Sequence, residues 1–272
     1  MRSKFFMFFL LLSLACLKTA SAGPPFLNDD PEPVEFKHWE AYLFSTHDAK
    51  RSSIDALGPA FEFNVGAAPN LQLHLIVPLA YSLPDSGPRT FGLGDIEVGF
   101  KFRFIQEGKE GSWRPQVGIF PLLEIPTGDA DRGLGNGRVW TKLPLLFQKS
   151  WEPWTTYGGF GYAINPAEGQ RNHFYGGWLV QRDMTKWLTL GGEVFAQEKD
   201  TDDGSHTVIL NFGGIIKITP AFNLLFSVGH SITGQDHLVG YFGLYWTGGV
   251  GQEEKQAKLS PKLSRVSYGS IR

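Results

Sequence analysis

Charged and polar side chains recur at every second position in several stretches of the 272-residue sequence. Residues 92–106 give the clearest example, because Asp95, Glu97, Lys101 and Arg103 alternate with Ile, Val and Phe. Rows of opposite charge can filter solutes in a pore, and they can equally fill a closed interior as ion pairs. The candidates for a pore lining are Glu62, His74, Asp95, Glu97, Lys101, Arg103, Glu124, Lys142, Glu193 and Lys217, together with Gln148.

Metal-binding chemistry is weakly represented in the sequence. The segment 129–137 (DADRGLGNG) carries Asp129 and Asp131, whose carboxylates suit calcium, but no bidentate Glu ends the segment. An exposed loop without a metal is the simpler interpretation. The 7 His residues form no H-E-x-x-H motif, and a single Cys excludes a cysteine zinc site. We expect no metal and no cofactor.

Hydrolytic chemistry has two candidate His and Ser pairs. Neighbouring residues in a strand point to opposite faces, so His230 and Ser231 cannot form a catalytic dyad there. Ser205 and His206 lie in an acidic loop, and no G-x-S-x-G motif is present. We expect no catalytic residues and no enzyme, and an outer-membrane lipid-modifying enzyme remains the enzymatic alternative.

The first 22 residues predict a secretory signal peptide. Two basic residues precede an apolar run over 5–17, and Ala20-Ser21-Ala22 forms a small-x-small cleavage site. The run is shorter than the roughly 20 residues of a membrane-spanning helix, and no later segment is long and apolar enough. Cleavage after Ala22 is therefore expected, with lipid attachment at Cys16 as the alternative.

From residue 37 the hydropathy pattern has a period of two, which is typical of β-strands. Phe100, Phe102 and Phe104 share one face of their segment, and Lys101 and Arg103 share the other. Frequent Gly (33 residues), 14% aromatic residues and only 19% charged residues agree with an all-β chain. Twelve strands are expected, at 37–45, 59–66, 70–82, 92–106, 113–126, 137–149, 155–165, 172–182, 187–198, 206–218, 223–232 and 238–247.

Length and loop pattern favour a transmembrane barrel over a soluble sandwich. Many segments reach the roughly 9–11 residues of a membrane strand, and the face opposite the apolar one is polar. Short turns alternate with longer polar loops, as in outer-membrane barrels, where the long loops face the outside. The longer connections are expected at 46–58, 83–91, 127–136, 166–171, 199–205 and 233–237.

Tryptophan marks one rim of the expected barrel. Six of the 8 Trp residues fall at strand ends on the short-turn side, as in an interfacial aromatic girdle. The alternative is that these rings cap the core of a sandwich. The six residues are Trp39, Trp113, Trp151, Trp154, Trp187 and Trp246.

Two polar segments flank the barrel, which we place at residues 37–248. Residues 249–272 are a basic tail, and residues 23–36 are a Pro-rich acidic stretch, which we call the N-terminal arm. The arm is either a free periplasmic leader or a plug that partly occludes the lumen. As a plug, its acids Asp29, Asp30, Glu32 and Glu35 would pair with Lys101, Arg103, Lys142 or Lys217.

Several stretches carry a family resemblance. They are GPAFEFNVGAAPNLQLHLIVPLAY (58–81), GLGDIEVGFKFRF (92–104), PLLEIPTGDADRGLGNGR (121–138), NHFYGGWLVQR (172–182) and GGEVFAQ (191–197). Over residues 37–247 the chain resembles the outer-membrane transporter family named after the meta-pathway of phenol degradation. The resemblance implies passage of small, often aromatic, compounds across the outer membrane, and it carries no catalytic residues.

These observations predict a twelve-stranded antiparallel transmembrane β-barrel in the bacterial outer membrane, contacting outer-membrane lipid. The expected function is a channel or transporter for a small, aromatic or hydrophobic solute. A net charge of −2 gives no basic footprint for nucleic acid. The alternatives are a lipid-modifying enzyme, a non-conducting structural barrel and a secreted soluble β protein. The sequence leaves the oligomeric state open.

Overall fold

The computed structural model describes residues 25–109 and 111–250. The predicted signal peptide, and all of the basic tail beyond Val250, lie outside the described residues. No helix among the described residues is long and apolar enough to cross a membrane.

Strands make up nearly all of the regular structure, and the exception is the short 3₁₀ helix η1 (Ala130–Arg132). The strands are β1 (His38–Lys50), β2 (Ser53–Ala68), β3 (Leu71–Pro84), β4 (Thr90–Leu93), β5 (Ile96–Ile105), β6 (Gln116–Ile119), β7 (Leu122–Ile125), β8 (Trp140–Trp151), β9 (Trp154–Ile164), β10 (His173–Asp183), β11 (Leu188–Gln197), β12 (Thr207–Thr219), β13 (Phe222–Gly234) and β14 (His237–Gly249).

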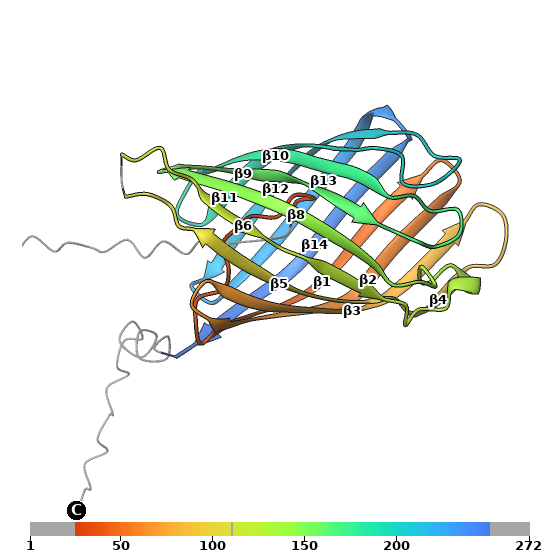
Figure 1. Ribbon diagram of the computed structural model, residues 1–272, viewed down its shortest axis with the longest axis horizontal. Coiled ribbons are helices and arrows are strands. Elements are labelled where there is room, and N and C mark those ends of the chain that lie inside the picture. The colour runs from red at the N-terminus through yellow and green to blue at the C-terminus, as the bar shows by residue number, and fades with distance from the viewer. Residues whose placement is uncertain (1–24, 110, 251–272) are drawn as a thin grey trace, which may run out of the picture.

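The strands form a closed antiparallel barrel with twelve strand positions, which we call staves (Figure 1). A stave is either one strand or two successive short strands. Each stave pairs with the staves before and after it in the sequence, and β1 pairs with β14 along its whole length, which closes the sheet. β4 and β5 together make one stave, because they pair with successive parts of β3. β6 and β7 make another stave between β5 and β8. The predicted fold class is therefore confirmed.

The two interrupted staves break where the ladder meets proline or glycine. Pro has no N–H to donate, so the pairing stops at Pro121 between β6 and β7. Phe120, the residue before it, is only 4% exposed, and its ring stands edge-on to His74. The break in the pairing thus places the Phe120 ring against the buried polar side chains of β3.

The two faces of the barrel wall carry the residues that the alternating hydropathy of the sequence predicts for them. Phe100, Phe102 and Phe104 are 40%, 40% and 49% exposed on the outer face, whereas Lys101 between them is 2% exposed. The same contrast holds on β3, where Leu73 is exposed and its neighbours Gln72 and His74 are buried. The wall is apolar toward its surroundings and polar toward the lumen, as a membrane barrel requires.

The prediction of a loop at 46–58 is wrong. β1 runs to Lys50 and β2 starts at Ser53, so only residues 51–52 connect them. Thr46 pairs with Tyr241 and Lys50 with His237, which continues the ladder through the whole predicted loop. Residues 46–53 of this hairpin are polar at nearly every position, so their hydropathy does not alternate although the backbone stays paired.

The predicted long connection at 233–237 is also wrong, because β13 runs to Gly234 and β14 starts at His237, which leaves a tight turn at 235–236. The other connections follow the prediction more closely. The connection after η1 and the segments 165–172 and 198–206 are long and lie on the rim that carries η1. On the opposite rim, β6 starts at Gln116 rather than at 113, so the turn 106–115 is longer than expected. The six predicted Trp residues lie on that turn rim, at strand ends or in turns, and Trp113 is 82% exposed.

Candidate functional site: the barrel lumen

The chain enters the lumen through a tight reversal at the turn rim. Lys37 has a left-handed backbone (φ 67°), its N–H donates to the carbonyl of Gly66 at 3.0 Å, and the N–H of His38 donates to the carbonyl of Glu35 at 2.9 Å. The reversal sends β1 along the wall and turns residues 25–36 inward. In Figure 1 this segment, coloured red, runs inside the barrel.

Contacts with strands on several sides of the barrel show that the arm lies inside the lumen. The N–H of Val34 donates to Gln72 on β3 at 2.9 Å, near the turn rim. Farther in, the hydroxyl of Ser227 on β13 donates to the carbonyl of Pro25 at 2.6 Å. A free leader is therefore the wrong alternative for the described part of the arm.

Two of the predicted cations hold the acids of the arm. The Lys101 ammonium lies 2.7 Å from Asp29 Oδ1 and 3.8 Å from Asp30 Oδ1. Arg103 lies 3.7 Å from Glu32, which also accepts hydrogen bonds from Gln116 at 3.2 Å and from Gln148 at 3.0 Å. Burial raises the pKa of Asp30 to about 7, and the nearby Lys101 charge opposes this rise.

Glu193 on β11 holds the inner end of the arm. Its Oε1 accepts from the backbone N–H and the side-chain amide of Asn28, at 2.6 and 2.7 Å. Its Oε2 accepts from the N–H of Leu27 and from the amide of Asn211, both at 2.9 Å. The carboxylate is only 2% exposed, so its charge is stabilised by four N–H donors in place of water.

Glycines in the wall make room for the arm. A side chain at Gly66 would overlap the backbone of Glu35, and a side chain at Gly177 would overlap the amide of Asn28. The wall at these two positions is therefore shaped for a chain lying against it. The sequence did not reveal that these glycines contact the arm. Gly-rich strands occur in many barrels and do not indicate which segment lies against them.

A second polar row links β2, β3, β5, β7 and β8. His74 contacts Glu62 at 3.6 Å and Glu97 at 3.1 Å, and Lys142 lies 3.8 Å from Glu97 and 3.6 Å from Glu124. Five predicted lining residues therefore form one chain of contacts along the inner wall. Lys142 does not pair with the arm, because two wall carboxylates occupy it.

The two remaining candidates lie elsewhere. Lys217 pairs with Asp183 at 2.9 Å near the turn rim and does not reach the arm. Asp95 accepts the backbone N–H groups of Gly128 and Asn136, at 2.9 and 2.6 Å, and so fixes the loop that carries η1. The lining role of all these residues stays a prediction.

A cavity of about 780 Å³ remains in the half of the lumen toward the long loops. Phe26 and Leu27 of the arm border it on one side, and Leu134 of the loop after η1 borders it on another. Asp95, Glu124 and Lys142 are the predicted lining residues that it touches. On the turn side, the lumen is filled by the arm and by an apolar cluster around Tyr42, Phe44, Ala60, Ile215, Leu225 and Tyr245.

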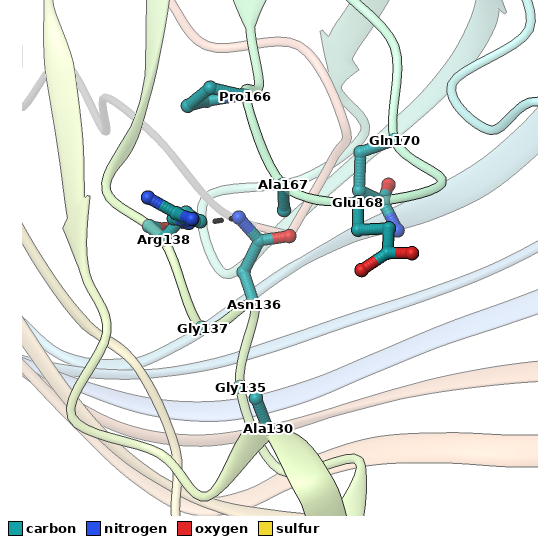
Figure 2. A pocket seen from close by; sticks show the side chains of 9 residues that line it. All are labelled: Ala130, Gly135, Asn136, Gly137, Arg138, Pro166, Ala167, Glu168 and Gln170. Atoms are coloured by element: carbon teal, nitrogen blue, oxygen red, sulfur yellow. Dashed lines mark hydrogen bonds between the residues drawn. The ribbon is translucent and has the colours of Figure 1, made fainter.

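A second cavity, of about 520 Å³, lies among the loops of the long-loop rim (Figure 2). Asn136 donates to the carbonyl of Arg138 at 3.0 Å and exchanges amide hydrogen bonds with Asn165, which ties two loops together. Gly135, Asn136 and Gln170 border both cavities. The two cavities therefore lie next to each other.

The candidates for metal and hydrolytic chemistry are on this rim too. Asp129 caps η1 by accepting from the N–H of Arg132, and no group of three or more His, Cys, Asp or Glu suited to a metal occurs among residues 25–109 and 111–250. His230 is exposed and lies 3.4 Å from Asp236, while Ser231 accepts from the N–H of His237.

Comparison with known proteins gives a family and a fold. A family model described as "Putative MetA-pathway of phenol degradation" matches residues 61–246, which confirms the resemblance noted in the sequence. No protein with a curated description matches the chain.

Solved structures with this fold are outer-membrane barrels. An outer membrane channel from Pseudomonas putida is 14% identical, with a TM-score of 0.66, and the match covers 80% of this chain and 98% of that one. The NanC porin is 8% identical with a TM-score of 0.53, and the match covers 76% of this chain and 98% of the porin. The KdgM porin is 10% identical with a TM-score of 0.52, and the match covers 75% of this chain and 98% of the porin.

Proposed function

This chain belongs to the family described as the MetA-pathway of phenol degradation, and from that membership and the lumen we propose an outer-membrane channel for small solutes. The chain is exported, loses its signal peptide and inserts with its apolar face against outer-membrane lipid. The long loops face the outside of the cell. The closed barrel with an internal cavity of about 780 Å³ is the observation that carries the proposal.

The N-terminal arm closes this channel. It occupies the turn-side half of the lumen, and it is held by ion pairs and hydrogen bonds rather than by a continuous apolar interface. Water hydrates these polar groups when the arm leaves, which offsets part of the free energy of the lost contacts. Release of the arm therefore opens a path from the cavity to the periplasm while the barrel remains folded.

The wall charges that stay behind then line the path. Lys101 and Arg103 on β5 lose their arm partners, while Glu62, His74, Glu97, Lys142 and Glu124 keep theirs. The open path is bordered by charges of both signs and by the apolar cluster around Tyr42, which suits a channel for small solutes. We propose no catalytic function for the barrel.

Recording from planar bilayers tests the proposal. The protein that starts at Gly23 is compared with a variant that starts at Phe36 and lacks the arm. The truncated barrel is expected to conduct more, and full-length protein is expected to approach it at high salt, where screening weakens the ion pairs. Equal conductance of the two proteins at low and at high salt would show that the arm does not close the channel.

Two further measurements separate the alternatives. If neither protein conducts, the barrel is structural and the channel proposal fails. Release of fatty acid from phospholipid vesicles by the purified protein would instead identify a lipid-modifying enzyme.

A further inference from the structure

The N-terminal arm leads to the larger cavity. From the turn rim the arm runs inward through Val34, which contacts Gln72, to Pro25, whose carbonyl accepts from Ser227. Pro25 and Phe26 both line the cavity of about 780 Å³. The chain that precedes Pro25 therefore starts from the edge of this cavity, inside the barrel.

The length of chain before Pro25 depends on removal of the signal peptide. Gly23 and Pro24 lie outside the described residues, and cleavage after Ala22 makes Gly23 the first residue of the mature chain. Two residues reach at most about 7 Å, so the new terminus cannot lie farther than that from Pro25. Hydrolysis of the bond between Ala22 and Gly23 leaves the carboxylate on the released peptide and an α-amine on the mature chain. This amine is mostly protonated, and so positively charged, at pH 7.

The lining of the cavity complements a positive charge. Lys50 lies 3.6 Å from Asp48 and 3.1 Å from Asp55, so two carboxylates share one cation. Asp200 accepts from the amide of Gln197 at 3.2 Å and pairs with no lysine or arginine among the described residues. With neutral histidines the lining has a net charge of −3, from five carboxylates and two lysines: Asp48, Asp55, Asp95, Glu124, Asp200, Lys50 and Lys142. An enclosed cavity screens this charge less than bulk water does.

The carboxylates are spread around the wall rather than gathered at one point. Among residues 25–109 and 111–250, no group of three or more His, Cys, Asp or Glu is placed to hold a metal ion. A single ammonium group suits such a wall, because its three N–H groups can donate to separate oxygens. Attachment to the arm favours its binding further, since the docked arm keeps the amine at a high effective concentration beside the cavity.

We propose that the α-ammonium group of Gly23, which removal of the signal peptide creates, docks in this cavity against its carboxylates and completes the plug. Gly23 and Pro24 extend the arm beyond its contact with Ser227 into the acidic cavity. This docking rests on the proposed function, because it requires export and cleavage after Ala22. Processing of the chain is then a step that closes the barrel, since the uncleaved chain has an uncharged amide at the same position.

Competitive acetylation of the refolded mature protein tests the docking. A limiting amount of an amine-reactive acetyl ester is added at pH 7 in detergent. Mass spectrometry then compares the N-terminal peptide with the peptide that contains Lys186, whose side chain is exposed. In the unfolded chain the α-amine reacts faster than a lysine, because a larger fraction of it is unprotonated. In the folded barrel we expect its rate relative to Lys186 to fall at least about tenfold. An unchanged ratio would overturn the proposal, whichever other cation occupies the cavity.

Two matched double variants separate attraction by the carboxylates from simple enclosure. Asp48→Asn with Asp200→Asn removes two charges from the cavity wall. Asp85→Asn with Asp203→Asn removes two charges from exposed positions on the same rim. The first is expected to speed acetylation of the α-amine at least about threefold, because fewer carboxylates stabilise its protonated form, and the second to leave the rate unchanged. Both must show the heat-modifiable gel migration of a folded barrel. Equal rates in the two folded variants would overturn the role of the carboxylates.

The channel and the docking of the terminus fail separately in these measurements. A barrel that conducts without the arm but leaves its α-amine unprotected retains the proposed function and loses this docking. A barrel that protects its α-amine but never conducts, with or without the arm, retains the docking and loses the channel. N-terminal sequencing of the exported protein that finds a start other than Gly23 would also overturn the docking.

Discussion

Replacing Glu193 with Gln is expected to release the N-terminal arm and to raise the open probability of the barrel. Each carboxylate oxygen of Glu193 accepts two N–H donors, and three of the four donors belong to the arm. The amide of Gln has one oxygen and one N–H₂ group, so two donors face a group that cannot accept them. In either orientation of the amide, at least one of these donors belongs to Leu27 or Asn28.

The magnitude follows from those lost bonds. A hydrogen bond to a charged group contributes roughly 1.5–3 kcal/mol, so loss of one or two weakens docking of the arm by about 3 kcal/mol. A loss of this size shifts the equilibrium constant between the docked and the released arm about 150-fold toward release. The barrel itself keeps its ladder, so its unfolding in denaturant is expected to change far less.

Single-channel recording measures the effect, with Glu124→Gln as the matched control. Glu124 borders the cavity and lies 3.6 Å from Lys142, but it is on the wall row that does not hold the arm. The Glu193 variant is expected to open often, and the Glu124 variant to resemble the unmodified protein. If truncation at Phe36 opens the barrel while Glu193→Gln does not, Glu193 does not hold the arm.

Three other predictions concern the barrel wall, pH and topology. Phe102→Arg, on the outer face, is expected to lower the free energy of unfolding by roughly 2–4 kcal/mol in vesicles, whereas Phe102→Leu is expected to have little effect. Because the docked pKa of Asp30 is raised to about 7, docking binds a proton. Docking is therefore expected to strengthen, and open probability to fall, from pH 8 to pH 5, and Asp30→Asn should remove this trend in recordings. An epitope inserted at 202–203 is expected to be labelled on intact cells, whereas one at 220–221 is not, and the opposite pattern would invert the topology.

The strands could be predicted because their two faces meet different surroundings. The contrast between Phe102 and Lys101 is visible in the sequence, since one side chain meets an apolar environment and the other a polar interior. The same reasoning failed for residues 46–58, because residues 46–53 are polar at nearly every position and their hydropathy no longer indicates the backbone pairing. Strand boundaries are reliable only within the apolar part of the wall.

The lumen was only partly predictable. The charges of Lys101 and Arg103 and the acids of the arm could be paired by sign, and the structure contains those pairs. The sign of the charge alone did not favour Lys101 and Arg103 over Lys142 as partners of the arm. In the structure Lys142 pairs with two carboxylates of the wall instead. The roles of Asn28 and Asn211 depend on which strands face each other across the barrel, and neutral amides carry no pattern that reveals this.

The contacts of the arm also set an order of assembly. Asn28 meets Glu193 across 165 positions of sequence, and Pro25 meets Ser227 across 202. The docking site therefore does not exist until β11 and β13 have joined the curved sheet, although the arm precedes both strands in the chain. Long-range contacts of this kind form late in folding. The arm, which precedes every strand in the chain, thus docks after the strands that it contacts, and we expect the barrel to close before it is plugged.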